Sequence, residues 1–577
     1  MNMKHLSNKL KTVVVLFSLV CLFSCNEDKG NYDYNEINEV GIEGLDGPFV
    51  FEIGDTKTLT PTLTFSQEED EGLFTYTWYY YDGGQWNAIH EGRNLELEIS
   101  GTFGKPTETT PYRLAYEIVN KKTQIPYRKL FNFTVVTPLA RGYVALCEKE
   151  DGFDIDMIAL QTNNTFTKYK NVLDLTGSNL PRKGVTPYDI VTFPDVMAPD
   201  PYNKSGAEYS VYVLTNQYTT RIKSADYSWL PTYDISNSIE SMSHLDTEYT
   251  KKGKPIIAQK LKTGYINVSS NTYVRSFIYH KEEDGTGNWY VCSRWPAWYF
   301  YSAQMNRMRP NGDSRYESAP YIAVGTQAAM YYDTGNNSFR IGFLPSSANA
   351  QNSTDLFYTE PLTETPDGVF NFNDSNDGLL YMGERLSSNL TDRAFAILKQ
   401  ADGTYKYIEF GVNTNMMVAI TGAPNKRRAS VFPTGSRIED AKFFAGAPYA
   451  NSPWLFYVTN DNKVFKADIS GSTAVIMEIT SSILKNDGYN EITTFKYLLP
   501  RTNGQSTPIK ESLAVGTYNA AKGKNEGGKL EFFLMANTTS GEISLAKFPT
   551  APREDGYQID MSWDGLGKIV GLDFKEQ

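Results

Sequence analysis

Cys25 is the residue whose surroundings most clearly predict a chemical modification. It ends the tetrapeptide Leu22-Phe23-Ser24-Cys25, which has the form of a lipobox, where a cysteine after a small residue is thioether-linked to diacylglycerol. Lysines precede the apolar run from Val13 to Phe23, which is the order of a secretion signal. The run is shorter than the about 20 residues that a membrane-spanning helix needs. We therefore expect residues 1–24 to be a lipoprotein signal peptide and Cys25 to be lipidated.

Two other interpretations of this segment fit less well. Cys21 follows the bulky Val20, whereas a lipobox needs a small residue there, although Phe23 is itself larger than usual for its position. An ordinary signal peptide with an unmodified Cys25 would need a small-x-small cleavage site instead. With Cys25 lipidated, Cys147 and Cys292 are the only cysteines after it, so the chain is not a disulfide scaffold.

An aromatic segment gives the candidate ligand site. The sequence from Ser293 to Tyr301 reads SRWPAWYFY, and sugar rings stack on aromatic faces of this kind. Pro296 would place Trp295 in a loop, with Trp298 beside it. Packing between strands is the simpler explanation for such a run, because large aromatic side chains are commonly buried. The candidate ligand-binding residues are Arg294, Trp295, Trp298 and Tyr299.

Two acidic segments have the oxygen ligands that calcium prefers. The first, DGFDID, carries Asp151, Asp154 and Asp156, and the second, NDSND, spans residues 373–377. Neither has the spacing of an EF-hand loop, so plain turns are the simpler interpretation. Paired carboxylates that meet in space can also hydrolyse glycosidic bonds without leaving any motif in a single sequence.

Familiar catalytic and cofactor motifs are absent from the sequence. There is no HExxH, CxxC, GxSxG, P-loop or dinucleotide fingerprint, and the histidines after the signal peptide, His90, His244 and His280, are widely separated. We therefore assign no catalytic residue, no metal site and no cofactor, and expect a protein that is not an enzyme. A glycosidase or lyase remains the alternative.

The sequence predicts that β-strands position the candidate residues described above. Residues 25–39 are polar and suit a flexible tether. From residue 40 to 138 short alternating segments separated by Gly, Pro and Asp predict a β-sandwich, with Trp78 as the residue that fills its core.

The same region resembles a known family. The segments CNEDKGNYDYNEINEV, EIGDTKTLTPTLTF, FTYTWYYYDGGQW, NLELEI and YRLAYEIVN, within residues 25–137, are similar to PKD-like outer-membrane lipoproteins encoded beside starch-utilisation-type (SusC/SusD-like) import systems. The resemblance covers about a fifth of the chain. It implies an Ig-like all-β module in a surface lipoprotein accessory to nutrient uptake, and it supplies no catalytic residues.

Residues 140–577 repeat a pattern of an apolar strand, a turn and a second strand. Tyr212–Asn216 with Thr220–Lys223 is one such unit, and seven units occur at an average spacing of about 62 residues. They predict a seven-bladed β-propeller in which the last strand, Lys568–Phe574, completes the first blade and leaves no exposed edge. Two or three further sandwiches in series are the alternative. Only Ile235–Thr250 has even a weak helical pattern.

Charge and the predicted anchor limit the partners. The formal charge of −12 becomes more negative without the lysines of the signal peptide, which excludes nucleic acid as a partner. By the family resemblance, Glu27 and Asp28 after the lipidated cysteine favour the outer face of the outer membrane over the periplasm. We therefore expect a surface lipoprotein that accompanies a SusC/SusD-like transporter and helps capture an oligosaccharide or an oligopeptide.

Overall fold

The computed structural model describes most of the chain from residue 37 to residue 575. The gaps in this description are residues 68–69, 108–109, 194–209, 241–255, 269–270, 294–298, 302–306, 309–314, 326–327, 344–357, 363–377, 386–392, 413–427, 448–451 and 499–510. The described part divides into two compact units. Unit 1 comprises residues up to 46, 59–95 and 114–131, and unit 2 comprises residues 47–58, 96–113 and 132–577.

Unit 1 is made of antiparallel strands. Its strands are β1 (Val40–Glu43), β4 (Thr62–Phe65), β5 (Phe74–Asp82), β6 (Gln85–Glu91) and β8 (Tyr112–Asn120). Trp78 on β5 is fully buried and packs on Tyr116, with 4.4 Å between the ring centroids, and its indole N–H donates to the Gly92 carbonyl oxygen. The prediction that Trp78 fills the core is confirmed.

The remaining strands of the N-terminal region complete its sheets. They are β2 (Phe49–Glu52), β3 (Thr56–Leu59), β7 (Leu95–Glu98) and β9 (Pro126–Val136). The strand orders are β2-β9-β8-β5-β6, β1-β4 and β3-β7, and β2 runs parallel to β9. All other pairs with a described register in this region are antiparallel.

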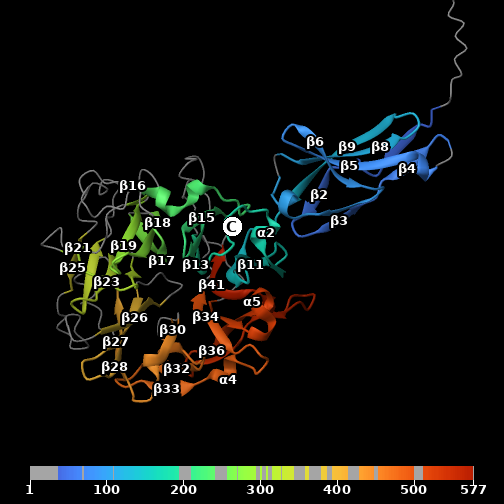
Figure 1. Cartoon of the computed structure of the whole chain (residues 1–577). Coiled ribbons are helices and arrows are strands. Elements are labelled where there is room, and N and C mark those ends of the chain that lie inside the picture. The colour runs from blue at the N-terminus through green and yellow to red at the C-terminus, as the bar shows by residue number, and fades with distance from the viewer. Residues whose placement is uncertain are drawn as a thin grey trace, which may run out of the picture. The chain divides into compact units, whose positions relative to one another are not determined.

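Unit 2 contains seven further sheets that are arranged around a common centre (Figure 1). Residues near this centre line a cavity. The edge strands that face this cavity are β13 (Pro187–Phe193), β17 (Ala258–Val268), β22 (Ala323–Val324), β26 (Gly378–Glu384), β30 (Ala441–Gly446), β34 (Glu491–Leu498) and β41 (Lys568–Lys575). Each of these strands contacts the next, and β41 contacts both β34 and β13, so the series returns to its start. The arrangement is propeller-like, and the strand order does not fit further sandwiches in series.

The other strands of these sheets follow outward from the cavity. They are β10 (Gly142–Lys149), β11 (Gly152–Leu160), β12 (Phe166–Tyr169), β14 (Ser210–Thr215), β15 (Thr219–Lys223), β16 (Ile239–Glu240), β18 (Asn271–Lys281), β19 (Gly287–Ser293), β20 (Tyr299–Tyr301), β21 (Arg307–Met308), β23 (Ala328–Asp333), β24 (Ser338–Phe343), β25 (Tyr358–Pro361), β27 (Arg393–Lys399), β28 (Tyr405–Gly411), β29 (Arg428–Phe432), β31 (Trp454–Thr459), β32 (Val464–Asp468), β33 (Val475–Glu478), β35 (Ser512–Tyr518), β36 (Gly528–Asn537) and β37 (Glu542–Leu545). Three short strands lie near the C-terminus: β38 (Lys547–Phe548), β39 (Ile559–Asp560) and β40 (Ser562–Leu566).

The last strand completes the first of these sheets, as predicted. The order in that sheet is β12-β11-β10-β41, and β41 pairs antiparallel with β10, for example Tyr143 with Phe574. The approach between β41 and β13 is close, because a Cβ atom at Gly571 would lie 2.7 Å from the backbone nitrogen of Ile190. Because β10 and β41 pair with each other, the facing edges of both strands are hydrogen-bonded and not exposed.

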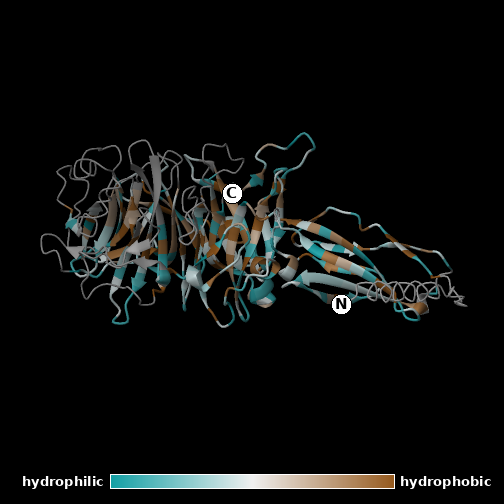
Figure 2. Ribbon diagram, turned by 90° about the horizontal axis from the view of Figure 1, so that it is seen from above, coloured by the Kyte–Doolittle hydropathy of each residue, from teal (hydrophilic) through white to brown (hydrophobic). Residues whose placement is uncertain are grey.

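The hydrophobic core lies between consecutive sheets. One cluster joins side chains of β27 and β28 to those of β31 and β32, including Phe395 and Tyr457. Both faces of an inner sheet are therefore covered, which is why every residue of β31 is buried. Hydrophobic residues accordingly lie along the strands, and hydrophilic residues occupy many of the turns (Figure 2).

Helices are few and short in the described residues. The α-helices are α2 (Val172–Leu175), α4 (Thr480–Ile483) and α5 (Gly523–Glu526). Single 3-10 turns are η1 (Glu71–Leu73), η2 (Gly101–Phe103), η3 (Pro231–Tyr233), η4 (Ile235–Ser238), η8 (Ile438–Asp440) and η9 (Ala520–Lys522). The weak helical pattern at Ile235–Thr250 is described only at its start, where residues 235–238 form η4 and residues 239–240 form β16; residues 241–250 lie outside the described residues.

Candidate functional site

The cavity enclosed by the edge strands of unit 2 is the candidate site. Its volume is about 700 Å³, within the range of small-molecule sites in proteins. Residues from all seven sheets contribute to its lining. Because successive side chains of a strand point to opposite sides, each edge strand can present alternate residues to the cavity while the others pack between sheets.

Tyr188 is the most exposed aromatic side chain of the cavity lining. It lies at the start of β13, between the buried residues Pro187 and Ile190, and 42% of its surface is accessible. A tyrosine ring left open in a concave site offers an apolar face for stacking and a hydroxyl for hydrogen bonding. Tyr188 therefore has the properties that the aromatic segment around Trp295 was predicted to supply.

Four lysines line the cavity, and the side chains of two of them have no partner among the described residues. Lys262 forms an ion pair with Glu384, with 2.9 Å between Nζ and Oε2. Lys442 donates to the side-chain oxygen of Asn462 and to the carbonyl oxygen of Ile492, and burial lowers its pKa. Lys260 and Lys496 make no hydrogen bond or ion pair with any residue that the structure describes. Their ammonium groups are therefore available to a ligand.

Each carboxylate of the cavity lining already accepts a backbone hydrogen bond. Asp189 accepts from the backbone N–H of Ile190, and Glu384 accepts from that of Val324 while it pairs with Lys262. Asp573 accepts from the backbone N–H groups of Thr192 and Phe574. At least one oxygen of each carboxylate is therefore occupied by a backbone N–H group.

Two tyrosines form an aromatic wall on neighbouring sheets. Tyr321 precedes β22 and Tyr381 lies on β26, and their rings meet edge to face with 5.0 Å between centroids. Burial raises the pKa of Tyr321 and of Tyr381. Both phenols therefore stay neutral at physiological pH and keep a hydroxyl proton that can be donated.

The sequence-predicted site residues fall mostly outside this cavity or outside the described residues. Cys25, Arg294, Trp295 and Trp298 lie outside the described residues, as does the acidic segment 373–377. Tyr299 begins β20, where it pairs with Ser293 of β19. The proposed site at residues 294–299 stays a prediction, and residues 294–298 form the connection between β19 and β20.

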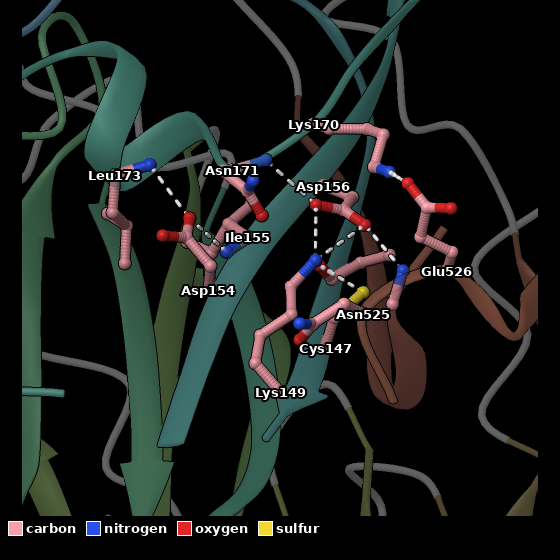
Figure 3. A network of polar contacts seen from close by, with 12 residues as sticks. Cys147, Lys149, Asp154, Ile155, Asp156, Lys170, Asn171, Leu173, Asn525 and Glu526 are labelled. Carbon is pink, nitrogen blue, oxygen red and sulfur yellow. Dashed lines mark hydrogen bonds and ion pairs between the residues drawn. The ribbon is translucent and has the colours of Figure 1, made fainter. Parts of the chain in front are cut away.

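The acidic segment around Asp154 and Asp156 is a structural network (Figure 3). Asp156 accepts hydrogen bonds from the Lys149 ammonium group and from the backbone N–H groups of Asn171 and Gly567, the last at 2.7 Å. Asp154 accepts from the backbone N–H groups of Ile155 and Leu173 and pairs with Arg182. These oxygens fasten β11 to α2 and to the segment before β41, so the calcium hypothesis finds no support there.

The network also contains a buried cysteine, and no metal-binding group is found nearby. Cys147 is fully buried, and burial raises the pKa of its thiol, so it is unreactive. Within the described ranges, no group of three or more His, Cys, Asp or Glu residues could hold a metal ion. In the same part of the chain no helix is long and apolar enough to span a bilayer.

Comparison with known protein families finds a match in the N-terminal part of the chain. Residues 25–183 match the PKD-like family. The matched range contains the predicted sandwich region 40–138 and continues into β10, β11, β12 and α2, and the boundary at residue 138 stays a prediction. The match covers less than half of the chain and describes that region alone. No curated protein matches the sequence.

Several solved structures are similar to the chain, at low sequence identity and with low TM-scores. A quinonprotein alcohol dehydrogenase-like protein from Bacteroides thetaiotaomicron is 11% identical with a TM-score of 0.38, and the alignment covers 93% of this chain and 99% of that one. A fucose-specific lectin from Aleuria aurantia is 11% identical with a TM-score of 0.25, over 63% of this chain and 90% of that one. A Hadza microbial sialidase is 10% identical with a TM-score of 0.22, over 74% and 94%.

Sequence reasoning did not find the cavity residues. Tyr188, Lys260 and Lys496 belong to no motif, and they lie on three different strands. The strands that carry them, β13, β17 and β34, lie outside the strand pairs by which the repeat was recognised, so no signal in the sequence pointed to these residues.

Proposed function

We propose that this protein is a non-enzymatic, lipid-anchored surface protein that binds an oligosaccharide or oligopeptide in the cavity of unit 2. The observation that carries the proposal is the lining of that cavity. It combines an open aromatic face at Tyr188 with unpaired lysines, whereas its carboxylates are committed to backbone hydrogen bonds. A lining of this kind holds a ligand in place without supplying a free acid and base.

The seven sheets around the cavity are, in this proposal, seven propeller blades. β41 would close the ring by completing the blade that begins with β10. A closed ring keeps its central cavity rigid because each blade is packed on two neighbours. A rigid, preformed cavity lowers the entropic cost of binding a ligand.

The proposals of a lipid anchor and of a transporter partner are based on the N-terminal residues. Lipidation at Cys25 would hold the chain at the outer membrane, facing the cell exterior, and the PKD-like region would lie between the anchor and the binding cavity along the chain. The family resemblance makes a SusC/SusD-like transporter and its surface lipoproteins the expected partners. The protein would deliver captured ligand to that transporter.

Isolation of the native complex tests this proposal. Solubilisation of outer membranes in mild detergent, followed by capture of the protein through a C-terminal tag, should recover a SusC/SusD-like pair in near-stoichiometric amounts. A Cys25→Ala variant, which lacks the lipidated cysteine, should recover far less of the pair because it is not held at the membrane. Recovery of the wild-type lipoprotein alone in repeated preparations would contradict the partner assignment.

A further inference from the structure

The cavity of unit 2 carries a charge pattern that differs from the rest of the protein. The whole chain has a formal charge of −12. The cavity lining, in contrast, contains four lysines and three carboxylates among its described residues. The lining therefore has one more lysine than it has carboxylates, so its charge is opposite in sign to that of the whole chain.

The ion pairs and hydrogen bonds within the cavity leave two of its four lysine side chains without a partner among the described residues. Glu384 neutralises Lys262, and the two aspartates accept hydrogen bonds from backbone N–H groups of β13 and β41. Lys260 on β17 and Lys496 on β34 are left without partners in the described structure. These two strands belong to sheets on different sides of the β13 and β41 pair, so a ligand in the cavity can be approached by ammonium groups from two sides.

An aromatic face accompanies the lysines. Tyr188 lies on β13, which contacts β17, the strand that carries Lys260. A sugar ring that stacks on the tyrosine would therefore place its substituents near that ammonium group. Combination of a stacking ring with unpaired cations matches a saccharide that carries carboxylate groups, since carboxylates accept charge-assisted hydrogen bonds from lysine.

We propose that the cavity of unit 2 binds an anionic oligosaccharide, with Tyr188 stacking on a sugar ring and Lys260 and Lys496 binding its carboxylates. This inference rests on the proposed binding function and adds the ligand class to it. The cavity volume of about 700 Å³ accommodates a few sugar units.

Titration calorimetry on the full mature chain tests the inference with matched ligands. The probes are tri-galacturonate and its methyl ester, which has the same shape but no charge. We expect the acid to bind at least tenfold more tightly than the ester, and its affinity to fall as sodium chloride is raised. Equal affinity for the two probes would overturn the inference.

Variants of the cavity lysines provide the second readout. Lys260→Gln and Lys496→Gln should each weaken binding of the acid about tenfold and leave binding of the ester unchanged. Lys547→Gln, at an exposed lysine that lies outside the cavity lining, is the matched control and should bind the acid as the wild type does. Unchanged affinity of both cavity variants would also overturn the inference.

The outcomes separate the ligand class from the binding function. If the ester binds as well as the acid and Tyr188→Ala abolishes both, the cavity binds neutral sugars and only the charge inference fails. If short poly-glutamate binds through the lysines and neither sugar does, the ligand is a peptide and the saccharide assignment fails. Recovery of the transporter pair is independent of all these results.

Discussion

At the scale of single residues, the buried lysine at the end of β41 has an environment built for a neutral amine. Lys575 donates from Nζ to the carbonyl oxygens of Leu139, at 2.7 Å, and Ser224, at 2.5 Å. Two acceptors match the two N–H groups of an uncharged amine. Burial lowers the pKa of Lys575 to about 7, although the nearby Asp226 opposes this shift.

This shift predicts a pH dependence of stability. The folded-state pKa lies below the unfolded value, so the unfolded chain binds more protons between about pH 7 and pH 10. The free energy of unfolding should therefore rise with pH across that window. Relative to Lys575→Met, the wild type should gain roughly 2 kcal/mol from pH 7 to pH 9, measured by urea unfolding followed by circular dichroism.

The control for this prediction is on the same strand. Lys568 is partly exposed and pairs with Glu491, so Lys568→Met should keep the pH slope of the wild type. A wild type and a Lys575→Met variant whose stabilities change in parallel between pH 7 and pH 9 would contradict the assignment of a neutral amine.

At the scale of elements, β41 joins the C-terminal end of unit 2 to its beginning. Ile569, Leu572 and Phe574 are buried in the cluster that also contains Tyr143 of β10. Burial of such side chains contributes about 1.5–3 kcal/mol each, and a domain is usually stable by only about 5–15 kcal/mol. Loss of this strand removes a large part of the net stability.

Truncation tests the role of β41. Removal of residues 568–577 should abolish the cooperative thermal transition and make unit 2 sensitive to protease, because β10 and β13 lose the strand between them. Removal of residues 576–577 alone should leave the transition unchanged. A chain that lacks residues 568–577 and still melts cooperatively near the wild-type temperature would show that the ring does not depend on this strand.

Much of the element pattern could be predicted from the sequence. Alternating residues predicted the strands around Trp78, because alternation is a local signal. The pairing of the final strand with β10 joins distant segments, and it followed from the expectation that a ring of repeats leaves no exposed edge. The cavity could not be predicted, since Tyr188, Lys260 and Lys496 are far apart in the sequence. The aromatic run around Trp295 is prominent by composition and lies largely outside the described residues, so its role stays a prediction.

At the scale of the whole molecule, the chain combines residues 25–183, which match the PKD-like family, with a propeller-like unit that encloses a cavity. In the proposed function, Cys25 would attach the chain to the membrane and the cavity would bind the ligand. The carboxylates Asp154 and Asp156 hold elements of unit 2 together, since backbone N–H groups and basic side chains bind their oxygens.

The central claim is that the cavity binds a ligand through Tyr188, and direct binding measurements test it. A glycan and peptide array probed with the mature protein should identify a ligand, and calorimetry should then compare variants with that ligand. Tyr188→Ala should weaken binding at least tenfold, whereas Tyr188→Phe, which keeps the ring, should bind nearly as the wild type does. Full binding by Tyr188→Ala, or release of a cleaved product from the ligand, would contradict the account.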